Sequence, residues 1–147
     1  MVFSCPFSEG YGLTETLFTS HTWPEDKRAG IVGGTTYSVN LMLQDVPDMK
    51  YYVVPGNKGE KVDYTQPRGE ICYKGASIFG GYFREPEKTA ECFDENGWFH
   101  TGDVGELQEN NALKIIDRKK NIFKLSQGEY IAPEKLEQAY LKSKYIQ

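Results

Sequence analysis

Apolar and polar residues alternate along much of the chain, with the period of two that is typical of strands with one buried face. Val39, Leu41 and Leu43 can share one face of such a strand, and residues 51–54 and 70–73 are further short candidates. Clusters of Gly, Pro, Asn and Asp separate these segments, as turns require. The pattern predicts a mainly β fold with some α, built as a small barrel or sandwich.

Helical spacing interrupts the strand pattern at two places. Pro86 stands at the first-turn position that proline tolerates and is followed by EKTAEC, which predicts a short helix. We expect Phe83 and Phe93 to pack at the two ends of this helix. A second helical pattern begins at Pro133 and continues toward the end of the sequence.

A hairpin is predicted in the second half of the chain. Residues 106–108 and 113–116 have strand patterns, and the turn sequence ENNA lies between them at residues 109–112. Asp103 and Arg118 stand just outside the outer ends of these strands. We therefore expect the hairpin to bring the two charged side chains close together.

Composition excludes several classes of function. Of the 147 residues, 39% are hydrophobic and 26% charged, and the net charge of −4 offers no basic face for nucleic acid. No apolar run approaches the roughly 18 residues of a membrane span, and the N-terminus lacks the pattern of a signal peptide. Cys5, Cys72 and Cys92 are not grouped with either histidine along the sequence, so neither a zinc site nor a disulfide framework is implied. A reducing compartment fits this cysteine usage.

The segment EGYGLTET carries the first candidate site. Tyr11 offers a flat aromatic face, and the flanking Gly10 and Gly12 let the backbone approach a ligand closely. Thr14 can donate a hydrogen bond to a phosphate oxygen, and Glu15 offers the hard oxygen ligand that Mg²⁺ prefers. A plain connection between a strand and a helix explains the same residues equally well.

The second candidate site is formed by Asp103 in HTGD and Arg118 in IIDRKK. A carboxylate after a Thr-Gly turn can accept hydrogen bonds from both hydroxyls of a ribose, or can simply cap the turn. Arg118 would then bring positive charge to the ribose or phosphate, or it could be a surface arginine paired with Asp117. His100 lacks a matched nucleophile, so we expect a hydrogen-bonded structural histidine.

Residues 9–16 and 97–137 together resemble the adenylate-forming acyl-CoA synthetases, and most closely their long-chain fatty acid branch. The resemblance covers essentially the whole chain and identifies it as a fragment. It implies that residues 1–118 are the C-terminal part of the large AMP-binding domain, with the nucleotide motif and a distorted small β-barrel subdomain. Residues 119–147 would then be a hinge and the truncated start of a small α+β C-terminal domain.

The resemblance also implies roles for individual residues. Six residues would bind ATP or AMP: Gly10, Tyr11, Gly12, Thr14, Asp103 and Arg118. Within this set Tyr11 would stack on adenine. Thr14 and Glu15 would act in catalysis, and Glu15 would hold Mg²⁺. Lys120 would be the hinge about which the C-terminal domain swings, and Gly128 would lie in a turn on the coenzyme A side.

The activity implied by the resemblance belongs to the parent protein. The parent would be an ATP-dependent acid–thiol ligase that converts a long-chain fatty acid to an acyl-adenylate and passes the acyl group to coenzyme A. It would act on the cytoplasmic side, with peripheral attachment to the endoplasmic reticulum or another intracellular membrane through segments outside this sequence. A lysine-containing phosphate loop and a C-terminal lysine of the family have no match in these residues. We therefore expect the fragment alone to be inactive.

Two other interpretations fit the same residues. The parent could activate another carboxylic acid, because related ligases share this skeleton. A protein of a different class, a nucleotide-binding or interaction module without turnover, could also keep these motifs. Finding or failing to find the phosphate loop and the distal lysine in the whole protein would separate these interpretations.

Overall fold

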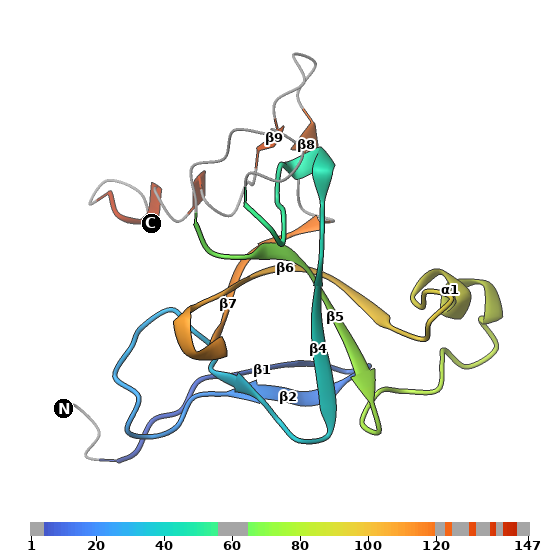
Figure 1. The fold of residues 1–147 in the computed structure, drawn as a ribbon, viewed down its shortest axis with the longest axis horizontal. Helices are drawn as coiled ribbons and strands as arrows, with labels where there is room; N and C mark the ends of the chain where they lie inside the picture. Colours follow the sequence, from blue (N-terminus) through green and yellow to red (C-terminus); the bar gives the residue numbers. More distant parts are fainter. Residues whose placement is uncertain are drawn as a thin grey trace.

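The computed structural model describes residues 5–55, 65–119, 123–124, 130–131, 136–137 and 140–143. Strands make up most of the regular structure of these residues (Figure 1). The strands are β1 Gly10–Leu13, β2 Leu17–His21, β3 Gly34–Thr35, β4 Val39–Gln44, β5 Arg68–Gly75, β6 Phe99–Leu107, β7 Leu113–Arg118, β8 Phe123–Lys124 and β9 Tyr130–Ile131. The helical segments up to residue 119 are α1 Pro86–Glu91 and the 3-10 turns η1 Pro47–Met49 and η3 Glu109–Asn111.

Two antiparallel sheets form the body of the molecule. One has the strand order β1-β2-β3 and the other β4-β5-β6-β7. A bridge between Gly33 and Leu113 joins the end of the first sheet to β7, so the strands curve around a common interior (Figure 1). The pairing among the described strands does not connect β1 to β4. The mainly β prediction is confirmed, and the barrel of these strands is open.

The hydrophobic core lies inside this curve and draws on several strands. Its fully or nearly buried members are Val39, Leu43, Ile71, Tyr73 and Leu113. The predicted face of Val39, Leu41 and Leu43 is confirmed, because Leu41 packs against this cluster although it is only partly buried. Alternation along β4 therefore determines which side of the four-stranded sheet faces the core.

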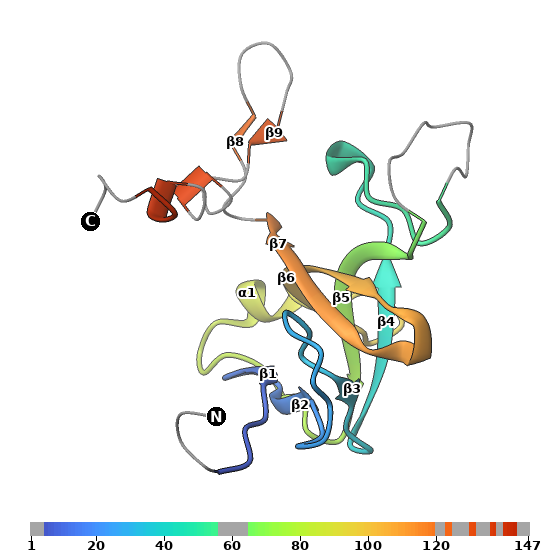
Figure 2. The same ribbon diagram turned by 90° about the vertical axis from the view of Figure 1, so that its left-hand side faces the viewer.

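The predicted hairpin is confirmed, with longer strands than the sequence indicated. β6 and β7 run side by side (Figure 2), and η3 forms the turn between them. Asp103 and Arg118 do not stand outside the strands, because the pairing continues and makes these two residues direct cross-strand partners. Gln108 lies beyond the end of β6, where its backbone N–H donates to the carbonyl of Ala112.

The predicted strand at residues 51–54 is wrong. Tyr51 forms a single bridge to Val46 on the other side of η1, and no strand continues from it. The next backbone groups are bonded elsewhere: the Val53 N–H donates to Asp45 Oδ1 at 2.7 Å, and the carbonyl of Tyr52 accepts from the Arg68 N–H at 3.0 Å. A turn and a side-chain cap thus replace the ladder that the apolar residues suggested.

The predicted helix at Pro86 is confirmed as α1, and of the two aromatic residues expected at its ends, Phe93 packs on other rings and Phe83 is exposed. Phe93 stacks on Phe79 and makes a tilted contact with Phe99. Phe83 is 85% exposed, and the guanidinium of Arg84 lies 5.0 Å from the centre of its ring. Phe83 therefore lies outside the core, and the guanidinium covers part of its apolar surface.

The C-terminal part of the chain is described only in pieces. β8 and β9 form an antiparallel pair, and residues 136–137 and 140–141 are helical, as their spacing predicts. Lys120, Gly128 and the helix start at Pro133 lie outside the described residues. The division of the chain after residue 118 therefore stays a prediction.

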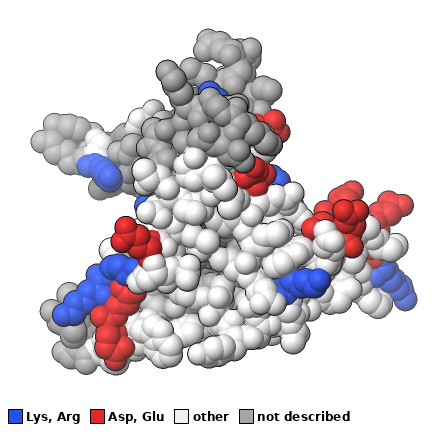
Figure 3. All heavy atoms as spheres, viewed as in Figure 1, with Lys and Arg blue, Asp and Glu red and all other residues white. Residues whose placement is uncertain are grey.

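The face shown in Figure 3 carries charged side chains of both signs. On the face shown in Figure 3, acidic and basic groups both lie toward the periphery, and the centre over the four-stranded sheet is largely uncharged. Strand β2 and the segment that follows it carry exposed apolar side chains instead. Leu17, Phe18 and Trp23 are 66%, 56% and 69% exposed.

Replacing Leu113 tests the position of the core. Leu113 is fully buried, so Leu113→Ala should lower the free energy of unfolding by about 2–5 kcal/mol, measured by denaturant titration. The control is Val54→Ala, which truncates a side chain that is 60% exposed and should change stability by less than about 0.5 kcal/mol. Equal losses in the two variants would contradict this description of the core.

Candidate nucleotide site

Three strands bring together residues that are far apart in the sequence. Tyr11 lies on β1, Asp103 on β6 and Arg118 on β7. The Tyr11 hydroxyl donates to Asp103 Oδ2 at 2.7 Å, and Arg118 Nε lies 3.2 Å from Asp103 Oδ1. The two predicted sites therefore meet at a single carboxylate.

Asp103 is held in place by its backbone as well as by its side chain. The Asp103 N–H donates to Thr101 Oγ1 at 3.1 Å, and the Thr101 hydroxyl donates to the carbonyl of Ile71 at 2.8 Å. Asp103 is only 7% exposed. Burial of a carboxylate is unfavourable without donors, and here Tyr11 and Arg118 supply one to each oxygen. Each oxygen has two lone-pair directions, so capacity remains for the hydroxyls of a ribose.

Tyr11 is built into the body of the fold. Its ring is partly buried, and its centre lies 6.4 Å from that of Tyr73. Burial, together with the hydrogen bond to the negatively charged Asp103, raises the pKa of the Tyr11 phenol well above its ordinary value. The phenol therefore stays protonated and donates to Asp103. Its predicted stacking on adenine would have to use ring surface that Tyr73 leaves free.

The glycines beside Tyr11 have a structural role in the hairpin. A Cβ at Gly10 would overlap the ring of Phe18, and one at Gly12 would overlap the backbone of Leu17. The pairing of β1 with β2 therefore requires glycine at Gly12, where the overlap is with backbone, and this reason differs from the close approach of a ligand. The segment joins two strands, so the alternative of a strand-to-helix connection is wrong.

Thr14 and Glu15 lie in the turn between β1 and β2. Thr14 is exposed, and Glu15 is partly buried. The hydroxyl of Tyr82 donates to Glu15 Oε1 at 2.8 Å. This hydrogen bond to a carboxylate raises the pKa of Tyr82 above its ordinary value. Tyr82 thereby orients Glu15 and leaves the second carboxylate oxygen for another partner.

A pocket of about 400 Å³ lies next to these residues. Its lining includes Glu15, Tyr82, Gly102, Arg118 and Lys119. Asp103 is not part of the lining but directly follows Gly102. A volume of this size is within the range of small-molecule sites, and both signs of charge are present.

The donor set can be tested for its fit to Mg²⁺. This ion is commonly held by one or two carboxylates together with waters and the phosphates of a substrate. Glu15 supplies one carboxylate on the wall of the pocket. The residues therefore fit a magnesium ion that arrives with a nucleotide.

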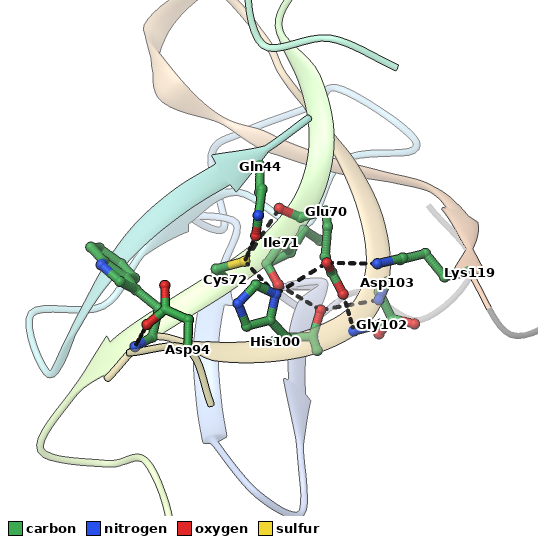
Figure 4. A network of polar contacts seen from close by, with 11 residues as sticks. Gln44, Glu70, Ile71, Cys72, Asp94, His100, Gly102, Asp103 and Lys119 are labelled. Carbon is green, nitrogen blue, oxygen red and sulfur yellow. Dashed lines mark hydrogen bonds and ion pairs between the residues drawn. The ribbon is translucent and has the colours of Figure 1, made fainter. Parts of the chain in front are cut away.

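A second polar cluster lies on the neighbouring strand β5 (Figure 4). Cys72 and His100 are cross-strand partners, and Cys72 Sγ lies 3.5 Å from His100 Nδ1. The same ring nitrogen lies 3.1 Å from Glu70 Oε2, which confirms a hydrogen-bonded histidine. Strand pairing thus brings together a cysteine and a histidine that are not grouped along the sequence.

The spacing of Glu70, Cys72 and His100 would suit a metal ion, since one ligand atom of each lies within 4.8 Å of the others. A cation is already present, however. Lys119 Nζ lies 2.9 Å from Glu70 Oε2. Burial and the charge of Glu70 raise the pKa of the Cys72 thiol to about 12, so Cys72 is a neutral thiol beside this ion pair. The cluster is best described as a hydrogen-bonded network around Glu70.

Sequence reasoning missed two residues of this region, Glu70 and Tyr82. Both act on the candidate site through partners that are remote in sequence. Glu70 stands in a strand pattern that gives no sign of its contacts, and Tyr82 lies outside both candidate motifs. The spacing of Asp103 and Arg118 was a usable signal because both lie on one hairpin.

Comparison with known sequences places these residues in a family context. The profile of the AMP-binding enzyme family matches residues 1–83. Fatty acyl-CoA synthetase A of Dictyostelium discoideum is 49% identical over 144 residues, which is 97% of this chain and 20% of that protein. Long-chain-fatty-acid–CoA ligase 1 of Homo sapiens is 48% identical over 97% of this chain and 19% of its own length. The chain thus spans about a fifth of the length of these relatives.

Solved structures give the same picture of the fold. The A domain of a carboxylic acid reductase from Segniliparus rugosus, in complex with AMP and a co-purified carboxylic acid, matches with a TM-score of 0.70 and 36% identity. That match covers 90% of this chain and 18% of the other. ATP-bound MatB from Rhodopseudomonas palustris matches with a TM-score of 0.70 and 29% identity, over 92% of this chain and 25% of its own.

The raised pKa of Cys72 predicts unequal thiol reactivity. At about pH 8 the buried Cys72 should stay protonated and resist alkylation, whereas the exposed Cys5 should react readily. Mass spectrometry of iodoacetamide-treated protein, before and after unfolding, measures both. Modification of Cys72 in the folded protein at a rate similar to that of Cys5 would contradict the assignment.

Proposed function

The chain belongs to the AMP-binding enzymes, and from this membership we propose that it is part of a long-chain fatty acid–CoA ligase. The whole protein joins the carboxylate of a long-chain fatty acid to the AMP part of ATP and releases pyrophosphate. It then transfers the acyl group to the thiol of coenzyme A and releases AMP. Names of the relatives at 45–51% identity support this choice of acid and thiol.

The observation that carries the proposal is the meeting of Tyr11, Asp103 and Arg118 beside a pocket that Glu15 also lines. These side chains come from separate strands and supply an aromatic ring, a carboxylate, a guanidinium and a potential magnesium ligand. A ribose next to phosphates requires this combination of groups. Two of the similar structures were solved with AMP or ATP bound, which supports a nucleotide at the corresponding place.

Each residue then has a defined task. Asp103 accepts hydrogen bonds from the ribose hydroxyls with the lone pairs that Tyr11 and Arg118 leave free. Arg118, whose side chain is 51% exposed, turns its remaining N–H groups toward the ribose or phosphate. Thr14 donates to a phosphate oxygen. Glu15 holds Mg²⁺, which neutralises phosphate charge when it is bound.

The 147 residues supply only a part of the ligase under this proposal. The exposed side chains of Leu17, Phe18 and Trp23 support packing of the first sheet against further parts of the whole protein. For the chain alone we propose weak nucleotide binding and no formation of acyl-CoA.

The location of the ligase is also a proposal. We propose action on the cytoplasmic side, with peripheral attachment to the endoplasmic reticulum or another intracellular membrane through segments outside this sequence. Within the part of the chain that the structure describes, no helix has the length and apolar character needed to cross a bilayer. Cys5, Cys72 and Cys92 are free thiols, which supports a reducing compartment.

Replacing Asp103 tests the nucleotide site. In the whole ligase, Asp103→Ala should weaken ATP binding by about 1.5–3 kcal/mol for each lost hydrogen bond to the carboxylate. Titration calorimetry with ATP and Mg²⁺, together with fatty acid-dependent release of pyrophosphate, measures the effect. Asp103→Asn keeps the size of the side chain and serves as the control for folding. Unchanged ATP dependence in a folded Asp103→Ala variant would contradict the assignment.

The proposed hinge requires a second experiment, on a residue outside the described part of the chain. Lys120→Pro should fix φ near −65° and restrict rotation, so acyl-adenylate formation should persist while thioester formation slows. Pyrophosphate release with fatty acid alone is compared with acyl-CoA formation when coenzyme A is present. Lys120→Ala is the control, because it removes the charge and leaves the backbone free. An equal loss of both steps in the proline variant would defeat the hinge proposal.

A further inference from the structure

Glu70 connects more elements around the candidate site than its place in a strand would suggest. Glu70 is 5% exposed, and its carboxylate has three partners (Figure 4). Oε1 accepts from the Gly102 N–H at 3.2 Å. Oε2 accepts from Lys119 Nζ at 2.9 Å and lies 3.1 Å from His100 Nδ1.

Two of these partners flank the residues assigned to the nucleotide. Gly102 directly precedes Asp103, and Lys119 directly follows Arg118. In the sheet order, β5 is the neighbour of β6 but not of β7. The bond from Glu70 to Lys119 therefore spans β6 and fastens the end of the more distant strand. The Glu70 carboxylate thus binds the residue before Asp103 and the residue after Arg118.

The part of β6 that leads into Asp103 is irregular, because its pairing register with β5 shifts between Glu70 and Cys72. Gly102 has a φ of +76°, in the left-handed region that favours glycine, and a Cβ built there would have no neighbour within 4 Å. Side-chain packing consequently does not hold this residue. The hydrogen bond from its N–H to Glu70 and the bond between Thr101 and the Asp103 N–H are what orient the peptide groups that lead into Asp103.

We propose that Glu70 is a positioning residue for nucleotide binding, which holds Asp103 and Arg118 in the geometry that engages the ribose. The proposal rests on the proposed function of the site. A carboxylate suits the role because it is an acceptor at both oxygens and its charge complements that of Lys119. Glutamine keeps the shape of the side chain but has only one acceptor oxygen. It therefore cannot accept from Gly102 at one terminal atom and from Lys119 at the other.

The rival explanation is that Glu70 only stabilises the sheet. The two explanations differ in what happens to recognition of the ribose hydroxyls. A general loss of stability weakens the binding of ATP and of 2′,3′-dideoxy-ATP to the same extent. Loss of positioning weakens ATP selectively, because the dideoxy nucleotide lacks the hydroxyls that Asp103 accepts from. The ratio of the two dissociation constants is therefore the quantity to measure.

The experiment uses titration calorimetry of the whole ligase with each nucleotide in the presence of Mg²⁺. Glu70→Gln should reduce the preference for ATP over 2′,3′-dideoxy-ATP by about tenfold, the size expected for one hydrogen bond to a charged group. Glu106→Gln is the matched control. Glu106 is also a buried carboxylate in an ion pair, with Arg68, but it lies outside the pocket lining. Its replacement should leave the ratio unchanged.

Lys119→Met supplies a second test if Glu70→Gln does not fold. It removes the tether on the side of Arg118 and leaves the hydrogen bond to Gly102, so it should reduce the ATP preference by less than Glu70→Gln. The proposal would be overturned if the folded variants kept the wild-type ratio of the two dissociation constants. An equal loss of affinity for both nucleotides leaves that ratio unchanged and would overturn it as well. Failure of the proposed function would look different, because the wild-type protein would then bind ATP without fatty acid-dependent pyrophosphate release or would not bind it at all.

Discussion

The register between β6 and β7 is the constraint on which the candidate site depends, because it makes Asp103 and Arg118 cross-strand partners. A shift by one residue would send the side chains of one strand to the opposite face. The other end of the hairpin prevents such a shift. There Leu113 pairs with Leu107 and is fully buried in the core, so a slip would expose it to solvent. Apolar packing at one end of the hairpin, together with the register shift between Val104 and Gly105, thereby places Asp103 opposite Arg118.

A second constraint is the burial of two carboxylates, Asp103 and Glu70, in the same part of the sheet. A buried charge is unfavourable unless donors surround it. Arg118 and Lys119, adjacent at the end of β7, supply one cation to each carboxylate, while Tyr11 and the Gly102 N–H add hydrogen bonds. The bonds that make burial tolerable also orient the groups facing the pocket. Stability and binding geometry therefore depend on the same contacts in this region.

Local sequence patterns predicted a considerable part of the fold. The strand with Val39 and Leu43, the helix at Pro86 and the hairpin after Asp103 are all present. Errors arose where a local pattern had competing partners. Residues 51–54 have apolar side chains suited to a strand, but their backbone hydrogen bonds go to Val46, to the side chain of Asp45 and to the N–H of Arg68. Phe83 has the character of a core residue and is exposed, because only tertiary packing decides which aromatic rings the interior accommodates.

The sequence by itself determined the class of fold, the candidate residues Tyr11, Asp103 and Arg118, and the chemistry that their side chains can provide. It could do so because alternation, turn residues and the short span of one hairpin are local properties of the chain. Only the tertiary structure decided which remote groups meet: Tyr82 with Glu15, and Glu70 with Lys119. These contacts depend on the order and register of strands, and those follow from how the whole core packs and not from any single segment.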